Sequence, residues 1–195
     1  NPSHYLAHPW EIPATWSGGM SFHGGCVGAL LLGYGYCRRH GIDFWRAADL
    51  FIVTVPIGLF FGRLGNFING ELYGRITTIP WGMVFPDGGS LPRHPSQLYE
   101  ALLEGVLLFV LLWSLKAKPW SASNRQWPHG TLLALFLGGY GCCRFIAEFF
   151  REPDAQLGLI FLHLSMGQLL CIGMIMAGIG MWIGRQHGVS RQKKT

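Results

Sequence analysis

Apolar residues along the chain gather into five runs that short polar stretches separate. The runs cover residues 22–36, 45–66, 98–115, 131–150 and 165–183. Several of them approach the ~20 residues that a helix needs to cross ~30 Å of hydrocarbon, and the first is a short span. The pattern therefore predicts an all-α polytopic membrane protein, with five transmembrane helices forming a single transmembrane domain over residues 1–195.

Helix signals refine the ends of these runs. Pro56 interrupts the second, which a membrane helix tolerates if neighbours satisfy the freed carbonyl. Pro95 and Ser96 predict a helix start with Ser96 as N-cap, and Ser165-Met-Gly-Gln168 fits a capping box. The sequence Arg151-Glu-Pro-Asp154 should stop the fourth helix, and the basic tail from Arg185 should be frayed.

Two further segments are expected to lie outside the helices. Residues 67–97 should form an irregular loop region, because Ile76–Pro95 holds four Pro and three Gly. The stretch Asn1–Gly19 carries Tyr5, Trp10 and Trp16 without Lys or Arg, which is typical of an interfacial loop.

Composition narrows the class of protein. Half of the residues are apolar and 13% are charged, which fits a membrane protein. The five cysteines form no Cys-x-x-Cys pair, so we expect no metal site and no cofactor. The net charge of +5 is spread between apolar runs, which argues against nucleic acid as a partner.

The basic residues also predict the orientation in the membrane. Ten lie on one side, namely Arg38, Arg39, Arg46, Lys116, Lys118, Arg125, Arg185, Arg191, Lys193 and Lys194. Five lie on the other, namely Arg63, Arg75, Arg93, Arg144 and Arg151. The positive-inside rule places the first group and the C-terminus in the cytoplasm, so residues 67–97 become a periplasmic, outer-face loop region.

The stretch Gly62–Arg75 gathers two Arg, one Glu, two Asn and four Gly after an apolar run. Only thirteen uncharged residues, 50–62, precede Arg63, so this side chain should lie within the bilayer near one face and must have a partner. A polar loop that caps a helix is one explanation. The other is an active centre, because the planar donor fork of Arg suits phosphate or carboxylate.

A second group of polar residues lies on the fourth run. Tyr140, Arg144, Glu148 and Arg151 have the spacing of one helix face. Arg144 and Glu148 either neutralise each other locally or form a cationic cradle with an orienting carboxylate. Glu100 and Glu104 are counter-charges for the arginines under the second interpretation.

Together these residues suit an anionic lipid headgroup at the outer face. Arginines would hold the phosphodiester and stabilise charge on a phosphate leaving group, while His23 or Glu148 takes a proton from a nucleophile. A lone His is more often structural, and no Gly-x-Ser-x-Gly elbow indicates an acyl-enzyme. An anion or lipid transporter with an outer-face Arg/Glu site is the alternative.

Four motifs resemble one family closely and in order. They are Gly18-Gly-Met-Ser-Phe-His-Gly-Gly25, Gly62-Arg-Leu-Gly-Asn-Phe-Ile-Asn-Gly-Glu-Leu-Tyr-Gly-Arg75, Leu91-Pro-Arg-His-Pro-Ser-Gln-Leu-Tyr-Glu100 and Arg144-Phe-Ile-Ala-Glu-Phe-Phe-Arg-Glu-Pro-Asp154. The chain thereby resembles the bacterial phosphatidylglycerol–prolipoprotein diacylglyceryl transferases. The resemblance implies a multi-pass inner-membrane enzyme whose active site faces the periplasm.

The resemblance also implies a reaction and its residues. Diacylglyceryl passes from phosphatidylglycerol to the lipobox Cys thiol of a prolipoprotein signal peptide, giving a thioether and glycerol phosphate. The implied catalytic residues are His23, Arg63, Tyr140, Arg144 and Glu148; the implied substrate-binding residues are Arg63, Asn66, Asn69, Glu71, Gly74, His94 and Arg144. The general base stays open between candidates.

The resemblance is not complete over the family's usual length. Its members usually have about seven spans, so two spans and an N-terminal active-site Tyr are expected to precede this chain. The loop Ile76–Ser90 also looks short beside other members. Recognition of the prolipoprotein by this loop is therefore left open.

Overall fold

The structure is a computed structural model that describes residues 8–11, 22–116, 127–152, 159–161 and 164–192. Within these ranges, the side chains of residues 22–23, 159–161, 164 and 187–192 are outside the description. The chain divides into two compact units, Asn1–Phe44 and Trp45–Thr195. Each unit is described by itself.

The first unit contains a single turn of 3₁₀ helix, η1 (Pro9–Glu11), and the helix α2 (Phe22–Arg39). The predicted span 22–36 lies within α2. Its last turn carries Arg38 and Arg39, which interact favourably with the helix dipole. Most of the expected interfacial segment Asn1–Gly19 lies outside the described residues.

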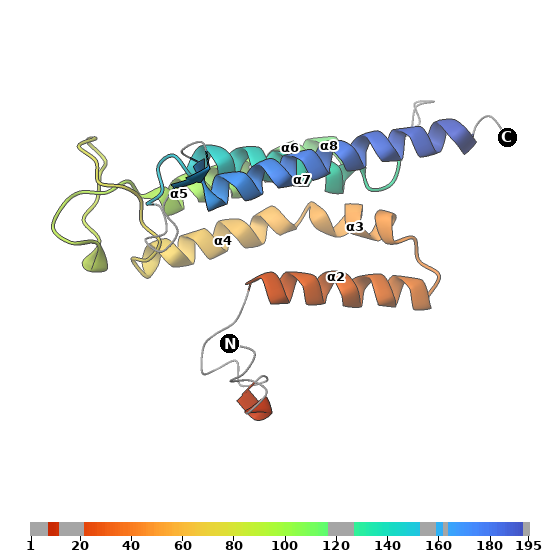
Figure 1. The fold of residues 1–195 in the computed structure, drawn as a ribbon, viewed down its shortest axis with the longest axis horizontal. Coiled ribbons are helices and arrows are strands. Elements are labelled where there is room, and N and C mark those ends of the chain that lie inside the picture. Colours follow the sequence, from red (N-terminus) through yellow and green to blue (C-terminus); the bar gives the residue numbers. More distant parts are fainter. Residues whose placement is uncertain (1–7, 12–21, 117–126, 153–158, 162–163, 193–195) are drawn as a thin grey trace. The chain divides into compact units, whose positions relative to one another are not determined.

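The second unit is a bundle of helices (Figure 1). It consists of α3 (Phe44–Ile52), α4 (Val55–Ile68), α5 (Ser96–Glu100), the π-helical η4 (Ala101–Leu107), α6 (Leu108–Leu115), α7 (Thr131–Ala147) and α8 (Met166–Gln192). The stretch from α5 to α6 is continuous. Two short strands, β1 (Leu159–Phe161) and β2 (Leu164–Ser165), pair antiparallel before α8.

Two of the described helical stretches are long and apolar enough to cross a membrane, Ser96–Leu115 and Met166–Gln186. The pair α3 and α4 also qualifies when counted as one span bent by 42°, which gives up to three among the described residues. This bend occurs where the sequence predicted an interruption, since Pro56 lies in the first turn of α4. The helix α7 is apolar but shorter.

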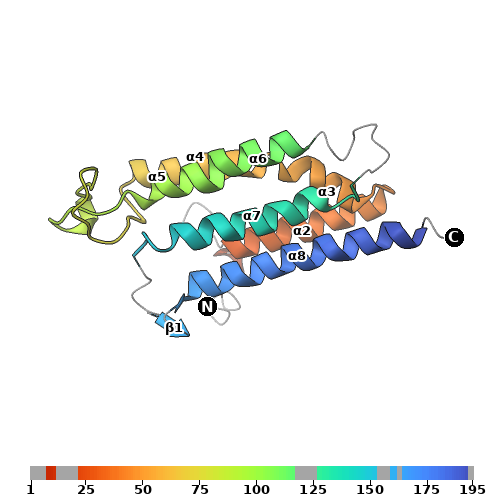
Figure 2. The ribbon, with the colours of Figure 1, turned by 90° about the horizontal axis from the view of Figure 1, so that it is seen from above.

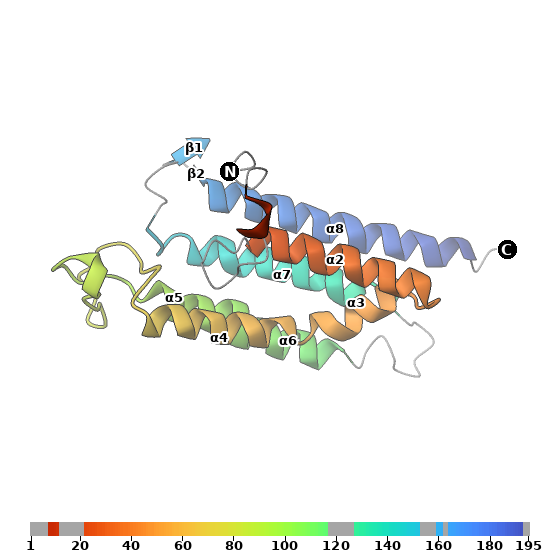
Figure 3. The same cartoon turned by 90° about the horizontal axis from the view of Figure 1, so that it is seen from below.

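Glycines allow the helices of the second unit to approach closely. A Cβ at Gly141 of α7 would lie 2.8 Å from Ile175 Cγ1 of α8, and a Cβ at Gly105 would lie 2.6 Å from Phe60 Cβ of α4. The helices α7 and α8 are neighbours along their length, as are α4 and the α5–α6 stretch (Figures 2 and 3). A buried apolar core lies between these elements, formed by Val53, Leu108, Leu112, Leu132 and Phe136.

A buried carboxylate fixes the start of α7. Asp49 of α3 accepts hydrogen bonds from the backbone N–H of Gly130, at 2.7 Å, and of Leu133, at 2.9 Å. It therefore caps α7 from another helix, where the dipole favours a negative charge. Nearby, Arg185 of α8 donates to the His129 carbonyl at 2.7 Å and lies over the Trp45 ring.

Three local predictions were wrong. The fourth helix ends at Ala147, so Arg151 is not on its face but forms a bridge with Gly74. Ser96 is the first residue of α5 and not its N-cap, because its hydroxyl donates to the Leu72 carbonyl. The tail from Arg185 is not frayed throughout, since α8 continues to Gln192.

The capping box before α8 is confirmed. The Gln168 N–H donates to Ser165 Oγ at 3.2 Å, and the Ser165 N–H donates to Gln168 Oε1 at 3.0 Å. The segment between α4 and α5 is irregular, as predicted. Its only described helical element is the 3₁₀ turn η3 (Pro86–Gly88), and backbone bridges join Ile76 and Met83 to Arg93.

Candidate active site

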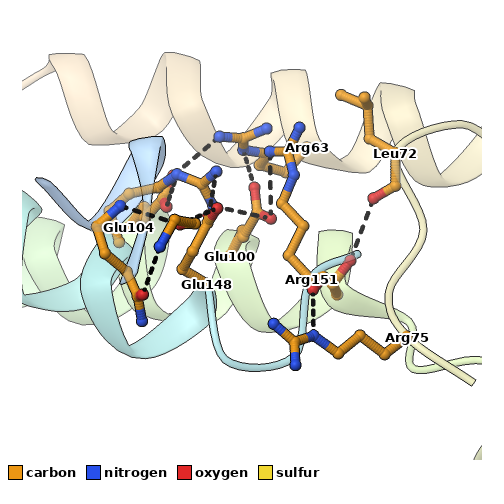
Figure 4. A network of polar contacts seen from close by, with 11 residues as sticks. Arg63, Leu72, Arg75, Glu100, Glu104, Glu148 and Arg151 are labelled. Carbon is orange, nitrogen blue, oxygen red and sulfur yellow. Dashed lines mark hydrogen bonds and ion pairs between the residues drawn. The ribbon is translucent and has the colours of Figure 1, made fainter. Parts of the chain in front are cut away.

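The candidate residues of the second unit come from elements that meet at one end of the bundle. The helices α4 and α7 end there, and α5 and α8 begin there (Figure 2). Residues 69–95 extend from the same end. Residues far apart in the sequence are thereby brought into one network of charges (Figure 4).

Glu100 is the centre of this network. Its Oε2 lies 2.8 Å from Arg63 Nε, and its Oε1 lies 3.2 Å from Arg144 Nη1 and 3.9 Å from Arg151 Nη1. The Glu100 side chain is 1% exposed. A buried carboxylate thus holds the arginines of α4 and α7 beside each other, as the sequence predicted for a counter-charge.

Glu104 and Glu148 complete the pairing. Glu104 Oε2 lies 3.3 Å from Arg63 Nη2, and Glu148 Oε2 lies 2.7 Å from Arg144 Nη2. The i, i+4 pair predicted on the fourth helix is therefore present, but Arg144 also contacts Glu100. The local pairing is confirmed, and the cradle interpretation stays a prediction. Three arginines face three glutamates, so the network is neutral when all six are charged.

Glu148 is held from a second direction by the start of α8. Ser165 Oγ donates to Glu148 Oε1 at 3.0 Å while it also caps the helix. A Cβ at Gly167 would lie 2.7 Å from Glu148 Oε1, so a larger residue there would require this carboxylate to shift. The capping box identified Ser165 from the sequence, but not its bond to Glu148.

The turn after α4 carries two of the predicted substrate-binding residues, Asn69 and Glu71. Both are exposed, and Asn69 Nδ2 donates to Glu71 Oε1 at 3.4 Å. Leu72 follows with φ of +56°, a left-handed conformation that costs a non-glycine residue about 1–2 kcal/mol. Ser96 and Gln97 of α5 donate to the carbonyls of Leu72 and Glu71. Sequence reasoning missed this contact, because no local pattern links the two segments.

Gly74 has a structural explanation. A Cβ there would lie 2.8 Å from His94 Cβ and closer still to the Phe150 carbonyl. The Gly74 N–H donates to the His94 carbonyl at 2.9 Å, and Arg75 Nε donates to the Arg151 carbonyl at 2.8 Å. Gly74 therefore lets the loop pair closely with the residues that follow α7.

His94 lies in an aromatic environment and not among the described ion pairs. Its Nδ1 is 3.3 Å from the Tyr99 hydroxyl, and the rings of Tyr99 and Phe150 contact it edge-on. Burial lowers the pKa of the His94 imidazole from its ordinary value of 6.5. The neutral form is therefore favoured in the folded protein.

The remaining predicted residues have different positions. Tyr140 is half-buried one turn before Arg144, and its ring stacks on Phe136 with centroids 5.8 Å apart. Asn66 lies one turn after Arg63 on α4. His23 belongs to α2 in the first unit, and its side chain lies outside the described residues.

The geometry suits binding of a monoanionic or dianionic group. A guanidinium has five N–H donors, and the ion pairs of Arg63 involve Nε and Nη2. Arginines that carboxylates hold in place bind phosphate without reorganising, which is a requirement for stabilising charge on a leaving group.

Comparison with known proteins shows that the chain is similar in sequence to members of one family. The sequence model of the family described as prolipoprotein diacylglyceryl transferase matches residues 3–184. A phosphatidylglycerol–prolipoprotein diacylglyceryl transferase of Desulfotalea psychrophila is 57% identical over 98% of this chain and 70% of its own length. Enzymes of the same name from Rhodospirillum rubrum and Geobacter sulfurreducens are 53% and 52% identical, over 94% and 93% of this chain.

The chain spans about two thirds of the length of these relatives, with 66% of the Rhodospirillum rubrum protein and 67% of the Geobacter sulfurreducens protein covered. The match runs through the charged network and the turn after α4. The chain belongs to the prolipoprotein diacylglyceryl transferase family.

Proposed function

We propose that this chain carries the active site of a phosphatidylglycerol–prolipoprotein diacylglyceryl transferase. The lipobox cysteine sulfur of a prolipoprotein forms a bond to the carbon of the diacylglyceryl unit of phosphatidylglycerol that carries the phosphate oxygen. The carbon–oxygen bond to the phosphate breaks, and glycerol phosphate leaves with the electron pair. The thiol proton passes to a base, and the product is a thioether. The names of the relatives support this activity.

The observation that carries the proposal is the joining of Arg63 and Arg144 through Glu100. The two guanidinium groups come from different helices, and one buried carboxylate contacts both, at 2.8 and 3.2 Å. Fixed guanidinium groups stabilise the charge that develops on a departing phosphate. In this proposal both arginines bind the phosphodiester and then the released glycerol phosphate.

The base is either His23 or Glu148. Glu148 contacts both Arg144 and Ser165, so its carboxylate has a defined position near the phosphate. Histidine commonly acts as a general base near neutral pH, which suits His23 to proton removal from a thiol. Tyr140 and Asn66 line the site beside the arginines. The remaining polar parts of the substrates are bound by Asn69, Glu71 and His94. Gly74 allows the backbone to come close to the substrate.

The proposed orientation follows from the charges. Five spans cross the bacterial inner membrane, at residues 22–36, 45–66, 98–115, 131–150 and 165–183, as parts of a single transmembrane domain. The end of the bundle with Arg63 and Arg144 faces the periplasm, with the irregular loop 67–97, and the C-terminus is cytoplasmic. The excess of Lys and Arg at the opposite end supports this orientation.

Headgroup selectivity tests the proposal against the transporter alternative. The full-length protein, given a lipobox peptide, should transfer diacylglyceryl from phosphatidylglycerol and hardly at all from phosphatidylethanolamine. The ammonium of the second lipid would face the same arginines. Equal use of the two lipids, or anion flux across vesicles without any change in the lipid, would contradict it.

A further inference from the structure

The start of α5 contacts the turn after α4 through two consecutive side chains. Ser96 Oγ donates to the Leu72 carbonyl at 3.1 Å, and Gln97 Nε2 donates to the Glu71 carbonyl at 2.6 Å. Both side chains are buried, with 0% and 1% exposed. Figure 4 shows the Leu72 carbonyl directed at this contact. The two donors together form a clamp on the backbone of Glu71 and Leu72.

The clamp holds a conformation that the chain otherwise disfavours. Leu72 has φ of +56° and is the only described non-glycine residue with positive φ. Its side chain is 44% exposed, so burial of that side chain does not explain the conformation. The turn is fixed on one side by the bond from the Glu71 N–H to the Asn66 carbonyl, and on the other by pairing of Gly74 with His94.

Gln97 adds a second unfavourable feature at the same place. Because its Nε2 must face the Glu71 carbonyl, its Oε1 faces elsewhere, and this buried oxygen has no hydrogen-bond partner among the described residues. Strained backbone and unpaired buried acceptors persist mainly where function requires the arrangement. Here the strained Leu72 backbone and the unpaired Gln97 oxygen lie beside one exposed pair of side chains, Asn69 and Glu71.

We propose that Ser96 and Gln97 are positioning residues that aim Glu71 at the hydroxyl groups of the phosphatidylglycerol headgroup. The inference rests on the proposed function. A carboxylate accepts hydrogen bonds and hydroxyls donate them, while the phosphate of the same headgroup is bound by Arg63 and Arg144. Glu71 lies three residues after the end of α4, the helix that carries Arg63, so the proposal places the two contacts in neighbouring parts of one site.

The test measures lipid binding, so it does not depend on transfer. The full-length protein is incubated with equal amounts of phosphatidylglycerol and phosphatidylethanol, an anionic lipid without headgroup hydroxyls, and the retained lipids are counted by native mass spectrometry. The wild-type protein should retain about tenfold more phosphatidylglycerol than phosphatidylethanol. Ser96→Ala should bring the ratio close to one, and Glu71→Ala should do the same. Because Ser96 and Glu71 act through the same contact with the lipid, the double variant should show the same lipid ratio as either single variant.

Two variants at Leu72 separate positioning from general damage. Leu72→Gly in the Ser96→Ala background should restore most of the preference, because glycine adopts positive φ without strain. Leu72→Ala in the same background is the matched control: it removes the same side chain but keeps the Cβ, so it should not restore the preference. Equal rescue by both, or no rescue by glycine, would overturn the inference.

The remaining outcomes also decide the matter. An unchanged lipid ratio in Ser96→Ala would refute the role of the clamp. Equal loss of both lipids in this variant would also refute it, because the clamp would then support the phosphate site or folding and not the hydroxyl contact. Wild type that shows no preference would refute the hydroxyl contact. A wild-type protein that discriminates between the lipids but transfers nothing to a lipobox peptide would refute the proposed function alone.

Discussion

Replacing Arg144 with lysine separates a phosphate-binding arginine from a merely neutralising one. In the structure Arg144 Nη2 lies 2.7 Å from Glu148, and Arg144 Nη1 lies 3.2 Å from Glu100. A lysine ammonium is a point charge that lacks the planar fork. It can pair with Glu148 across one helical turn, but it cannot present two parallel donors to a phosphate as well.

The size of the effect distinguishes the two roles. If Arg144 only neutralises the glutamates, Arg144→Lys should retain most of the activity. If it stabilises charge on the leaving phosphate, losing that contact should cost on the order of 3 kcal/mol, or about a hundredfold in kcat. We expect the second result, because Arg144 contacts two carboxylates that hold it beside Arg63.

The assay is transfer from phosphatidylglycerol to a lipobox peptide, with rates divided by the amount of folded protein in the membrane. Arg93→Lys is the matched control, because Arg93 binds the carbonyl of Gly88 at 2.8 Å and pairs with Glu152, outside the network of Arg144. It should lower thermal stability and leave kcat per folded protein within about threefold. Near-normal turnover of Arg144→Lys at equal protein levels would refute the reasoning and leave Arg63 as the phosphate ligand.

Substitutions at three further positions test the surroundings of the site. Gly74→Ala should lower the free energy of unfolding by about 2 kcal/mol or more, because its Cβ would lie 2.8 Å from His94 Cβ; an unchanged melting temperature would contradict this packing. Ser165→Ala should cost about 1–2 kcal/mol of stability through the lost cap and should also lower kcat through Glu148, whereas Ser165→Thr should retain both. Since burial lowers the pKa of His94, the unfolded state binds its proton more readily, so the free energy of unfolding should fall as the pH drops below about 6.5. His94→Phe should flatten that part of the pH profile, and an identical profile would contradict the assignment.

Apolar runs separated by polar stretches predicted where the helices lie, although only some of these helices are long and apolar enough to cross a membrane. The break near Pro56 and the capping box at Ser165 were also predictable, since both depend on residues adjacent in sequence. The helix end at Ala147 was not. Gly74 pairs with Arg151 across the loop, and α7 therefore ends before the point at which the proline at position 153 would stop it.

The sequence predicted which charged residues form the site, but not which of them contact one another. Arg63, expected within the bilayer near one face, required a partner, and the sequence suggested Glu100 and Glu104. That Glu100 alone joins three arginines depends on how α4, α5 and α7 pack, which no local pattern specifies. The same holds for the contact of Ser96 with Leu72, where two segments twenty-four residues apart meet.

The most direct test of the account is chemical identification of the product. The full-length protein is incubated with phosphatidylglycerol and a lipobox peptide, and peptide and water-soluble products are analysed by mass spectrometry. We predict that the peptide cysteine gains one diacylglyceryl group that survives neutral hydroxylamine, which cleaves thioesters but neither thioethers nor oxygen esters, with an equal amount of glycerol phosphate released. An unmodified peptide, a hydroxylamine-sensitive acyl group on the cysteine, or modification without release of glycerol phosphate would contradict the account.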